Sequence, residues 1–317
     1  MSAPLASTAY FNGSFMPLAE ANVNVMTHAL NYGTACFEGI RGYWNEDQEQ
    51  LYLFRMQEHY ERLVKSCRIL NMVPPGTPEE LGQITLEMLR RDNPRHDVYI
   101  RPLVYKSSLA IGVRLHNVDD GFVLFYALLG KYIDNQSGCR CCTSTYRRVD
   151  DNGIPARAKI TGIYVNSALA KSEAELNGFD EGIMLTQEGH VSEGSGENIF
   201  LIIDGKLVTP APSENILMGI TRASVIELAK NELGIDTIER QVDRTELYIA
   251  DEVFMTGTAA EITPVGEIDR RDVGAGGIGP ITAQLQDLFF RAVKAELPAY
   301  TGWCTPVYQP VAASREG

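Results

Sequence analysis

Residues 155–164 read PARAKITGIY, and within this stretch an extended segment gives way to a helix. One lysine, Lys159, stands there among small and apolar residues, and the nearest acidic residues are several positions away. Burial disfavours the charged form of an amine and lowers its pKa, which makes a lysine nucleophilic. A lysine that extends its charged end into solvent is the commoner case. The stretch alone leaves both interpretations open, and the rest of the chain has to decide between them.

The composition indicates a globular protein, and its length favours two domains. The chain has 317 residues, of which 44% are hydrophobic and 22% charged, enough for a sizeable core. The formal net charge of −13 argues against nucleic acid as a partner, because phosphate binding requires a basic face. The most apolar run, FVLFYALL at 122–129, is too short to span a bilayer, so we expect no membrane partner either.

The first residues and the cysteines predict a cytoplasmic protein. The start, MSAPLASTAYFNG, has neither the basic nor the apolar region of a secretory signal. Three of the six cysteines lie in CRCC at 139–142, which could suggest a metal site. No second cysteine pair or histidine cluster would complete tetrahedral coordination. We therefore expect free, buried thiols in a reducing compartment and no metal.

The hydrophobic pattern divides the chain near residue 130. Before it we expect strands at 51–56, 97–107 and 122–129, a helix at 59–70, and a new helix start after the break at 74–80. KYIDNQSG at 131–138 is polar and turn-rich, and is the best linker candidate.

After the linker a helix is expected from about Tyr164, with Gly178 as its stop. Its predicted apolar face consists of Val165, Ala168, Leu169, Ser172 and Leu176. Hairpin turns are expected at 188–189 and 204–205, a helix at 220–234, and a strand, turn and strand at 251–265. The chain is therefore predicted to be an α+β protein.

Two residues make a reactive Lys159 the better interpretation. Tyr164 could donate a hydrogen bond to an anionic ring oxygen. Glu193 lies in SEGSGENIF (192–200), whose glycines let the backbone approach a ligand closely. A carboxylate fixed against a pyridine nitrogen keeps that ring protonated, as an electron-sink cofactor requires. The alternative is that 192–198 is only a polar loop.

Three further features favour a phosphate group. Gly219 and Thr221 in LMGITRAS (217–224) open a helix, whose free N–H groups attract phosphate, although an ordinary helix cap by Thr221 is the alternative. TGTAA (256–260) is a second turn of small residues, with a hydroxyl at Thr258. Arg55 could bind phosphate with two hydrogen bonds, or form a surface ion pair with Glu58 or Glu61. The inventory matches a phosphorylated pyridine aldehyde bound as a Schiff base.

Motifs along nearly the whole chain resemble one family. They are YFNGSF, HALNYGTACFEGIRGY, FRMQEHYERL, YIRPL, IPARAKITGIYVNS, EGIMLT, VSEGSGENIF, MGITRASVIELA and YIADEVFMTGTAAEITPV. In this order and context they strongly resemble the branched-chain amino acid aminotransferases, fold-type IV enzymes that depend on pyridoxal 5′-phosphate.

The resemblance implies cofactor roles position by position. Lys159 is similar to the Schiff-base lysine, which also carries the proton in catalysis, Glu193 to the partner of the pyridine nitrogen, and Tyr164 to the donor to the ring hydroxyl oxygen. The remaining implied cofactor contacts are Arg55, Asn198, Ile220, Thr221, Gly257 and Thr258.

The resemblance also implies a substrate pocket. Its apolar part would accept leucine, isoleucine or valine, and Arg101 would bind the second carboxylate of glutamate or 2-oxoglutarate in ping-pong transamination. A structural salt bridge is the alternative for Arg101. The implied substrate residues are Tyr32, Phe37, Gly39, Tyr99, Arg101, Val113, Tyr132, Thr258 and Ala259.

The implied fold has a small N-terminal α/β domain at 1–128, an interdomain loop at 129–137 and a larger pseudo-barrel α/β domain at 138–317 that binds the cofactor. Such enzymes are at least dimeric, and a hexamer is possible. In the oligomer, Tyr32 and the loop near Val113 would reach a neighbouring subunit's site.

Relatives with this scaffold keep other functions open. Leu129 stands where a tryptophan is expected and Ile111 where methionine is common, so transaminases of wider range, acting on R-amines or D-amino acids, remain alternatives. A lyase that eliminates pyruvate from aminodeoxychorismate is another, although it would not need Arg101 beside an aromatic pocket. A non-catalytic phosphate-binding protein would not need Lys159, Tyr164 and Glu193 together.

Overall fold

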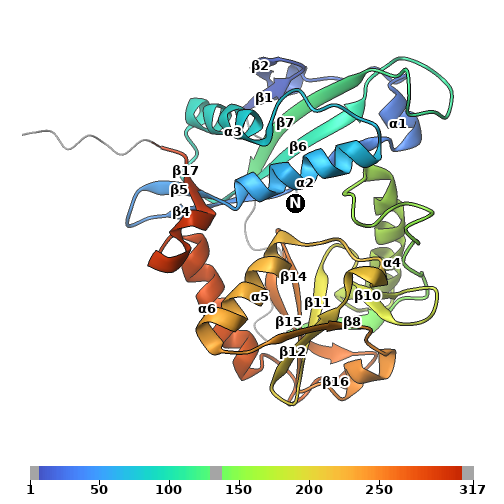
Figure 1. Cartoon of the computed structure of the whole chain (residues 1–317), viewed down its shortest axis with the longest axis vertical. Helices are drawn as coiled ribbons and strands as arrows, with labels where there is room; N and C mark the ends of the chain where they lie inside the picture. The colour runs from blue at the N-terminus through green and yellow to red at the C-terminus, as the bar shows by residue number, and fades with distance from the viewer. Residues whose placement is uncertain (1–6, 129–137, 309–317) are drawn as a thin grey trace, which may run out of the picture.

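The computed structural model describes residues 7–128 and 138–308. The predicted linker at 131–138 therefore lies almost wholly outside the described residues, as do Leu129 and Tyr132. The described chain forms two sheets, one above the other in Figure 1, with helix α2 between them.

The first sheet has eight strands in the order β17-β5-β4-β6-β7-β1-β2, with β3 paired to β6. Strand β6 shows the alternation of buried and half-buried residues that its sequence predicts. The strands are β1 Thr8–Phe11, β2 Ser14–Pro17, β3 Ala35–Phe37, β4 Ile40–Asn45, β5 Gln50–Phe54, β6 Val98–Lys106, β7 Asp120–Leu128 and β17 Cys304–Pro306.

The second sheet has nine strands in the order β10-β9-β8-β15-β14-β11-β12-β13, with β16 paired to β15. Its buried strands and the covering helices give the mixed α+β architecture that was predicted. The strands are β8 Cys139–Thr143, β9 Glu181–Leu185, β10 Val191–Glu193, β11 Asn198–Ile203, β12 Lys206–Pro210, β13 Thr237–Arg240, β14 Glu252–Gly257, β15 Glu261–Ile268 and β16 Arg271–Asp272.

The α-helices are α1 His28–Tyr32, α2 Met56–Ile69, α3 Pro78–Asp92, α4 Tyr164–Leu176, α5 Ile220–Leu233 and α6 Pro280–Val293. Short 3₁₀ turns lie at η1 Leu18–Glu20, η2 Thr161–Ile163, η3 Pro212–Glu214, η4 Arg244–Tyr248 and η5 Pro298–Trp303. Helix α3 begins after the break at 74–77, where Thr77 and Glu80 form a capping box. The predicted hairpin turn at 204–205 joins β11 to β12 and is of type I′, because Asp204 and Gly205 both have positive φ angles, of 50° and 70°.

We propose that the chain divides into two domains at about residue 130, since strands β1 to β7 all belong to the first sheet and strands β8 to β16 to the second. Strand β17 is the exception. It follows the strands of the second sheet in sequence but pairs antiparallel with β5 of the first sheet, with Cys304 opposite Phe54.

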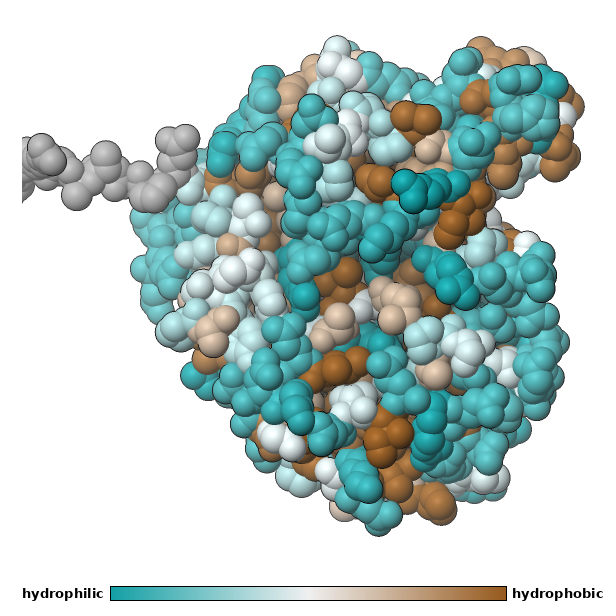
Figure 2. All heavy atoms as spheres, in the orientation of Figure 1, coloured by the Kyte–Doolittle hydropathy of each residue, from teal (hydrophilic) through white to brown (hydrophobic). Residues whose placement is uncertain are grey.

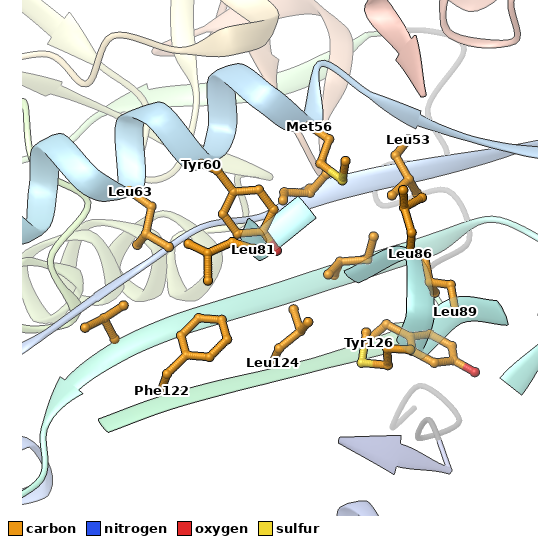
Figure 3. Packing of buried hydrophobic residues seen from close by; sticks show 14 of the residues in the cluster. Leu53, Met56, Tyr60, Leu63, Leu81, Leu86, Leu89, Phe122, Leu124 and Tyr126 are labelled. Carbon is orange, nitrogen blue, oxygen red and sulfur yellow. The ribbon is translucent and has the colours of Figure 1, made fainter. Parts of the chain in front are cut away.

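Two buried clusters position the helices. One packs α2 and α3 on the first sheet, and includes the residues that Figure 3 labels: Leu53, Met56, Tyr60, Leu63, Leu81, Leu86, Leu89, Phe122, Leu124 and Tyr126. The other packs α5 and α6 on the second sheet and also contains Tyr43 and Phe54 of the first. Because this cluster joins the two sheets, the groove between them has a fixed geometry.

The predicted apolar face of α4 is exposed and does not pack on the core. Val165, Leu169 and Leu176 are 65%, 43% and 87% exposed, and the buried face consists of Ser167, Ala170 and Ala174. The helix lies so close to β9 that a side chain at Gly182 would come within 2.9 Å of the Ala170 carbonyl oxygen. Close approach selects small residues, and this overrides the hydrophobic spacing.

Candidate active site

The groove between the sheets contains two adjoining cavities. The inner cavity is lined by Lys159, Tyr164, Glu193, Asn198, Ile220, Thr221, Gly257 and Thr258, all predicted cofactor contacts. The outer cavity, of about 520 Å³, is lined by the predicted substrate residues Phe37, Gly39, Tyr99, Arg101, Thr258 and Ala259. Lys159, Tyr164 and Thr258 line both, so the candidate nucleophile lies where the cavities meet.

Lys159 is held by an extended segment that runs beside β3. Its backbone carbonyl accepts a hydrogen bond from the Phe37 N–H at 3.0 Å, and its N–H donates to Ser66 Oγ at 3.2 Å. The side-chain Nζ donates to the Tyr164 hydroxyl at 2.7 Å and lies 5.1 Å from the centre of the Phe37 ring. The amine is therefore directed into the groove and away from bulk solvent.

Glu193 ends strand β10 and is only 5% exposed. Its carboxylate pairs with Arg148 at 2.7 Å and accepts hydrogen bonds from Asn198 Nδ2 and the Leu217 N–H, each at 3.0 Å. Burial raises the pKa of the Glu193 carboxyl, and the Arg148 guanidinium opposes that effect. Three donors fix the orientation of the carboxylate at one end of the inner cavity.

The other end of the inner cavity suits a phosphate. Gly219 caps helix α5 without a side-chain hydrogen bond, so the first N–H groups, at Ile220 and Thr221, are available to a ligand. A side chain at 219 would collide with Asn198 Oδ1 at 2.1 Å, so only glycine fits. Thr256 lines the same cavity, and its buried Oγ1 has no hydrogen-bond partner among the described residues.

Arg55 does not reach either cavity. Its guanidinium pairs with Glu58 at 2.8 Å, donates to Ser224 Oγ at 2.9 Å and lies over the Trp303 ring at 4.8 Å. The alternative, an ion pair with Glu58, is therefore the arrangement found.

Two arginines line the inner cavity, Arg148 and Arg62, and Arg62 lies about two turns further along α2 than Arg55. It is held by the buried carboxylate of Glu38, at 2.7 and 2.8 Å, and donates to the Met218 carbonyl at 2.7 Å. FRMQEHYERL contains two arginines, and both stand at same-face helical spacing from His59, so the sequence offers no signal that separates Arg62 from Arg55.

Arg101 is aimed into the outer cavity. It donates to the Tyr99 hydroxyl at 3.0 Å and lies 4.4 Å from the centre of the Phe37 ring. In the described ranges, 7–128 and 138–308, no carboxylate pairs with it, and its buried Nε has no partner. The predicted alternative, a structural salt bridge, is not found there. A desolvated guanidinium without a counter-ion is suited to an anionic ligand.

Tyr32 and Val113 lie away from both cavities. The Tyr32 hydroxyl accepts a hydrogen bond from the Gly112 N–H at 3.1 Å, and Val113 is 88% exposed in the loop between β6 and β7. Tyr132 lies outside the described residues.

The part of the chain that the structure describes contains no group of three histidine, cysteine or acidic side chains placed to hold a metal ion. All six cysteines are free and buried. None of the described helices is both long and apolar enough to cross a membrane.

Comparisons with known proteins agree with this geometry. Residues 35–268 match the family described as amino-transferase class IV. A probable branched-chain-amino-acid aminotransferase of Aquifex aeolicus (strain VF5) is 52% identical over 300 residues, which cover 95% of this chain and 96% of that protein.

Solved structures of the same kind superpose closely. The branched-chain aminotransferase of the thermophilic archaeon Thermoproteus uzoniensis, solved with norvaline, has a TM-score of 0.91 and 42% identity, covering 96% of this chain and 100% of that one. The branched-chain amino acid aminotransferase of Thermobaculum terrenum in its PLP form has a TM-score of 0.91 and 38% identity, covering 96% of this chain and 99% of that one.

The chain therefore belongs to the class IV aminotransferases, enzymes of the transferase class. Within them it groups with the branched-chain-amino-acid aminotransferases of fold type IV. The cofactor of this family is pyridoxal 5′-phosphate, and the inner cavity fits it: Glu193 suits the ring nitrogen, Tyr164 the ring oxygen, and the start of α5 with Thr256 the phosphate.

Proposed function

We propose that this enzyme exchanges the amino group between the L-branched-chain amino acids leucine, isoleucine and valine and 2-oxoglutarate. Donor and acceptor use the same outer cavity in turn, so the kinetics are ping-pong. The observation that carries the proposal is the Arg101 guanidinium, which lies beside the Phe37 and Tyr99 rings and has no carboxylate partner among the described residues. Such a cavity offers an apolar wall to a branched side chain and a cation to the second carboxylate of glutamate.

Lys159 is proposed to hold the cofactor aldehyde as a Schiff base at rest and to move the substrate α-proton as general base and acid. Bound pyridoxal 5′-phosphate supplies a protonated ring that stabilises the charge left on the α-carbon. Glu193, fixed by three donors, keeps that ring nitrogen protonated. The hydroxyl of Tyr164, 2.7 Å from Lys159 Nζ, keeps the amine at the boundary of the two cavities.

Replacing Arg101 by alanine should slow the glutamate half-reaction on the order of 10²-fold, because a hydrogen-bonded charge contributes about 1.5–3 kcal/mol. The leucine half-reaction needs no cation at that point, and we expect it to change by less than about threefold. Single-turnover absorbance measurements of the cofactor, with each amino acid separately, give both rates. Arg140→Ala is the control, since that arginine pairs with Asp180 on the surface.

Equal losses in the two half-reactions would argue against the role of Arg101. A donor panel with 2-oxoglutarate as acceptor separates the remaining candidates. Activity on R-amines or D-amino acids would indicate a wider range, and pyruvate release without an acceptor would indicate an aminodeoxychorismate-type lyase.

We further propose that the enzyme is a homodimer or higher homo-oligomer. Exposed apolar side chains gather around α1 and the β6–β7 loop, and Figure 2 shows hydrophobic atoms on this lobe. We call them the α1 patch: Val23, Val25, Met26, Leu30, Leu109, Ile111 and Val113. Gly33, at the end of α1, accepts a hydrogen bond from the Gly162 N–H, so the exposed stripe of α4 begins beside the patch. If a second subunit covers the α1 patch and the exposed residues of α4, Tyr32 and Val113 of this subunit would lie at the outer cavity of that second subunit.

Leu30→Asp, a change in the α1 patch, should therefore shift the enzyme towards monomers, because each charge would be buried at a cost of several kcal/mol. Sedimentation velocity at micromolar concentration measures the shift, and Ile249→Asp, at a side chain that is 77% exposed on another part of the surface, is the control. A wild-type enzyme that sediments as a monomer would contradict the proposal.

The six free cysteines support a reducing compartment, and we propose the cytoplasm.

A further inference from the structure

Three buried carboxyl groups surround the loop between β10 and β11, residues 194–197. Glu193 ends β10, Glu197 precedes β11, and Glu181 begins the neighbouring strand β9. They are 5%, 7% and 1% exposed. Successive N–H groups of the loop hold two of them: Ser195 donates to Glu181 at 3.3 Å, and Gly196 donates to Glu197 at 3.0 Å. Glu181 and Glu197 therefore lie side by side beneath the loop.

Two of the three carboxyl groups have a cation. Arg148 pairs with Glu193 at 2.7 Å, and Lys171 of helix α4 pairs with Glu181 at 3.0 Å. Both also accept backbone N–H groups, from Leu217 and from Gly182. Each of these two carboxyl groups is thus held by one cation and by backbone N–H donors.

Glu197 has no such partner. It forms no ion pair with any residue that the structure describes, and its carboxyl accepts a hydrogen bond from the neighbouring Gly196 N–H. A desolvated carboxyl beside two carboxylates favours the protonated form. Burial and the neighbouring Glu181 raise the pKa of Glu197 to about 8, which favours its neutral form near neutral pH.

Glu197 is also placed at the active site. It lines both cavities, and in the outer one it shares the wall with Thr258 and Ala259. The loop of Gly257 lies across from it, since a side chain there would come within 3.5 Å of Glu197 Cγ. Glu197 therefore forms part of the wall that a ligand in the outer cavity would face.

We propose that Glu197 is a specificity-determining residue whose neutral carboxyl admits the carboxylate of the substrate to the outer cavity, and whose ionisation at alkaline pH excludes it. This deepens the proposed function and rests on it for the class of ligand. A fixed negative charge in a water-poor cavity would repel an anion strongly. The neutral acid removes that repulsion and keeps a hydrogen-bond donor in the wall.

Charged and titratable groups face Glu197 from several elements packed against it. A hydrogen bond with Cys139 and burial raise the pKa of the Cys141 thiol on β8, so that thiol stays neutral in the same range. The turn at 256–258 presents no titratable side chain. The remaining charged or titratable side chains that face Glu197 are Glu181 on β9, Glu193 on β10, Lys171 on α4, and Lys159, Tyr164, Arg62 and Arg148 around the inner cavity.

The test measures binding of 4-methylpentanoate to the cofactor-loaded enzyme between pH 6.5 and 9.5. This probe is a branched carboxylate without an amine, so its own charge is constant over the range. In the wild type, affinity should fall about tenfold for each pH unit above the transition, roughly 30-fold by pH 9.5. In Glu197→Gln, which cannot ionise, the affinities at the two ends should differ by less than about threefold.

Two further variants keep the test independent of how well Glu197→Gln folds. Glu181→Gln removes the adjacent negative charge, which favours ionised Glu197 and moves the transition to lower pH. Glu175→Gln is the matched control: this carboxylate lies on the other side of Lys171, at 3.7 Å, but is 61% exposed, and the transition should not move.

The outcomes are distinct. The same pH dependence in wild type, Glu197→Gln and Glu181→Gln, in enzymes that still transaminate, would overturn the role of Glu197. A wild type that neither binds the cofactor nor transaminates would instead refute the proposed function.

Discussion

Replacing Lys159 by alanine will lower the rate of transamination by at least about 10⁴-fold, because the variant loses the covalent attachment of the cofactor and the proton carrier together. Lys159 Nζ is the amine at the boundary between the two cavities, and Tyr164 and Phe37 hold it there. Arg62 and Arg148 also line the inner cavity, but a guanidinium remains protonated and cannot replace the amine as a base.

Two measurements check this prediction. Steady-state assays give the rate, with Lys206→Ala, an exposed lysine on β12, as the control. Borohydride reduction of the wild type followed by peptide mass analysis should place the cofactor on residue 159. Normal turnover by Lys159→Ala, or labelling of another lysine, would refute the assignment.

Replacing Arg62 by glutamine will weaken cofactor binding by about 10²- to 10³-fold, whereas Arg55→Gln will leave it unchanged. Arg62 lies in the inner cavity beside the start of α5, and each hydrogen bond from a charged donor contributes about 1.5–3 kcal/mol. Arg55 is occupied by Glu58 and Ser224. Titrating the apoenzyme with pyridoxal 5′-phosphate measures both affinities.

The Arg62→Gln variant will also be less stable than the wild type, and the loss of stability must be measured separately from the loss of cofactor affinity. Glu38 is fully buried, and without Arg62 it would lack its cation, at a cost of about 3–5 kcal/mol. The double variant Glu38→Gln/Arg62→Gln removes both charges and should recover stability in urea unfolding without recovering cofactor affinity. If Arg55→Gln weakens binding as much as Arg62→Gln, the phosphate is held differently from our proposal.

The sequence predicted those parts of the site that lie in continuous motifs. The 192–200 loop, the turn at 256–260 and the start of α5 each bring small residues and hydroxyls to one place within a few positions, so their local pattern was sufficient. The local sequence pattern could not tell whether Arg55 or Arg62 lines the inner cavity. Both belong to the same motif, and only the packing of α2 against the loop at Met218 decides which one faces the groove.

Other features depend on contacts that the pattern does not encode. The α4 face was predicted wrongly because hydrophobic spacing ignores how closely Ala170 must approach β9. The role of Glu197 was not predicted, because the raised pKa of its carboxyl depends on burial and on Glu181, which the sheet brings beside it. A signal was available: Glu197 stands in the same loop as Glu193, and that loop has no basic residue.

The pairing of β17 with β5 has a consequence for how the molecule is made. The ribosome releases β5 long before β17, yet Cys304 must lie opposite Phe54 before that sheet edge is covered. Until β17 has been synthesised, the nascent chain presents an open strand edge, which is a site for wrong pairing. The N-terminal sheet is thus begun first and finished last, and truncating the chain before residue 304 would leave that edge uncovered.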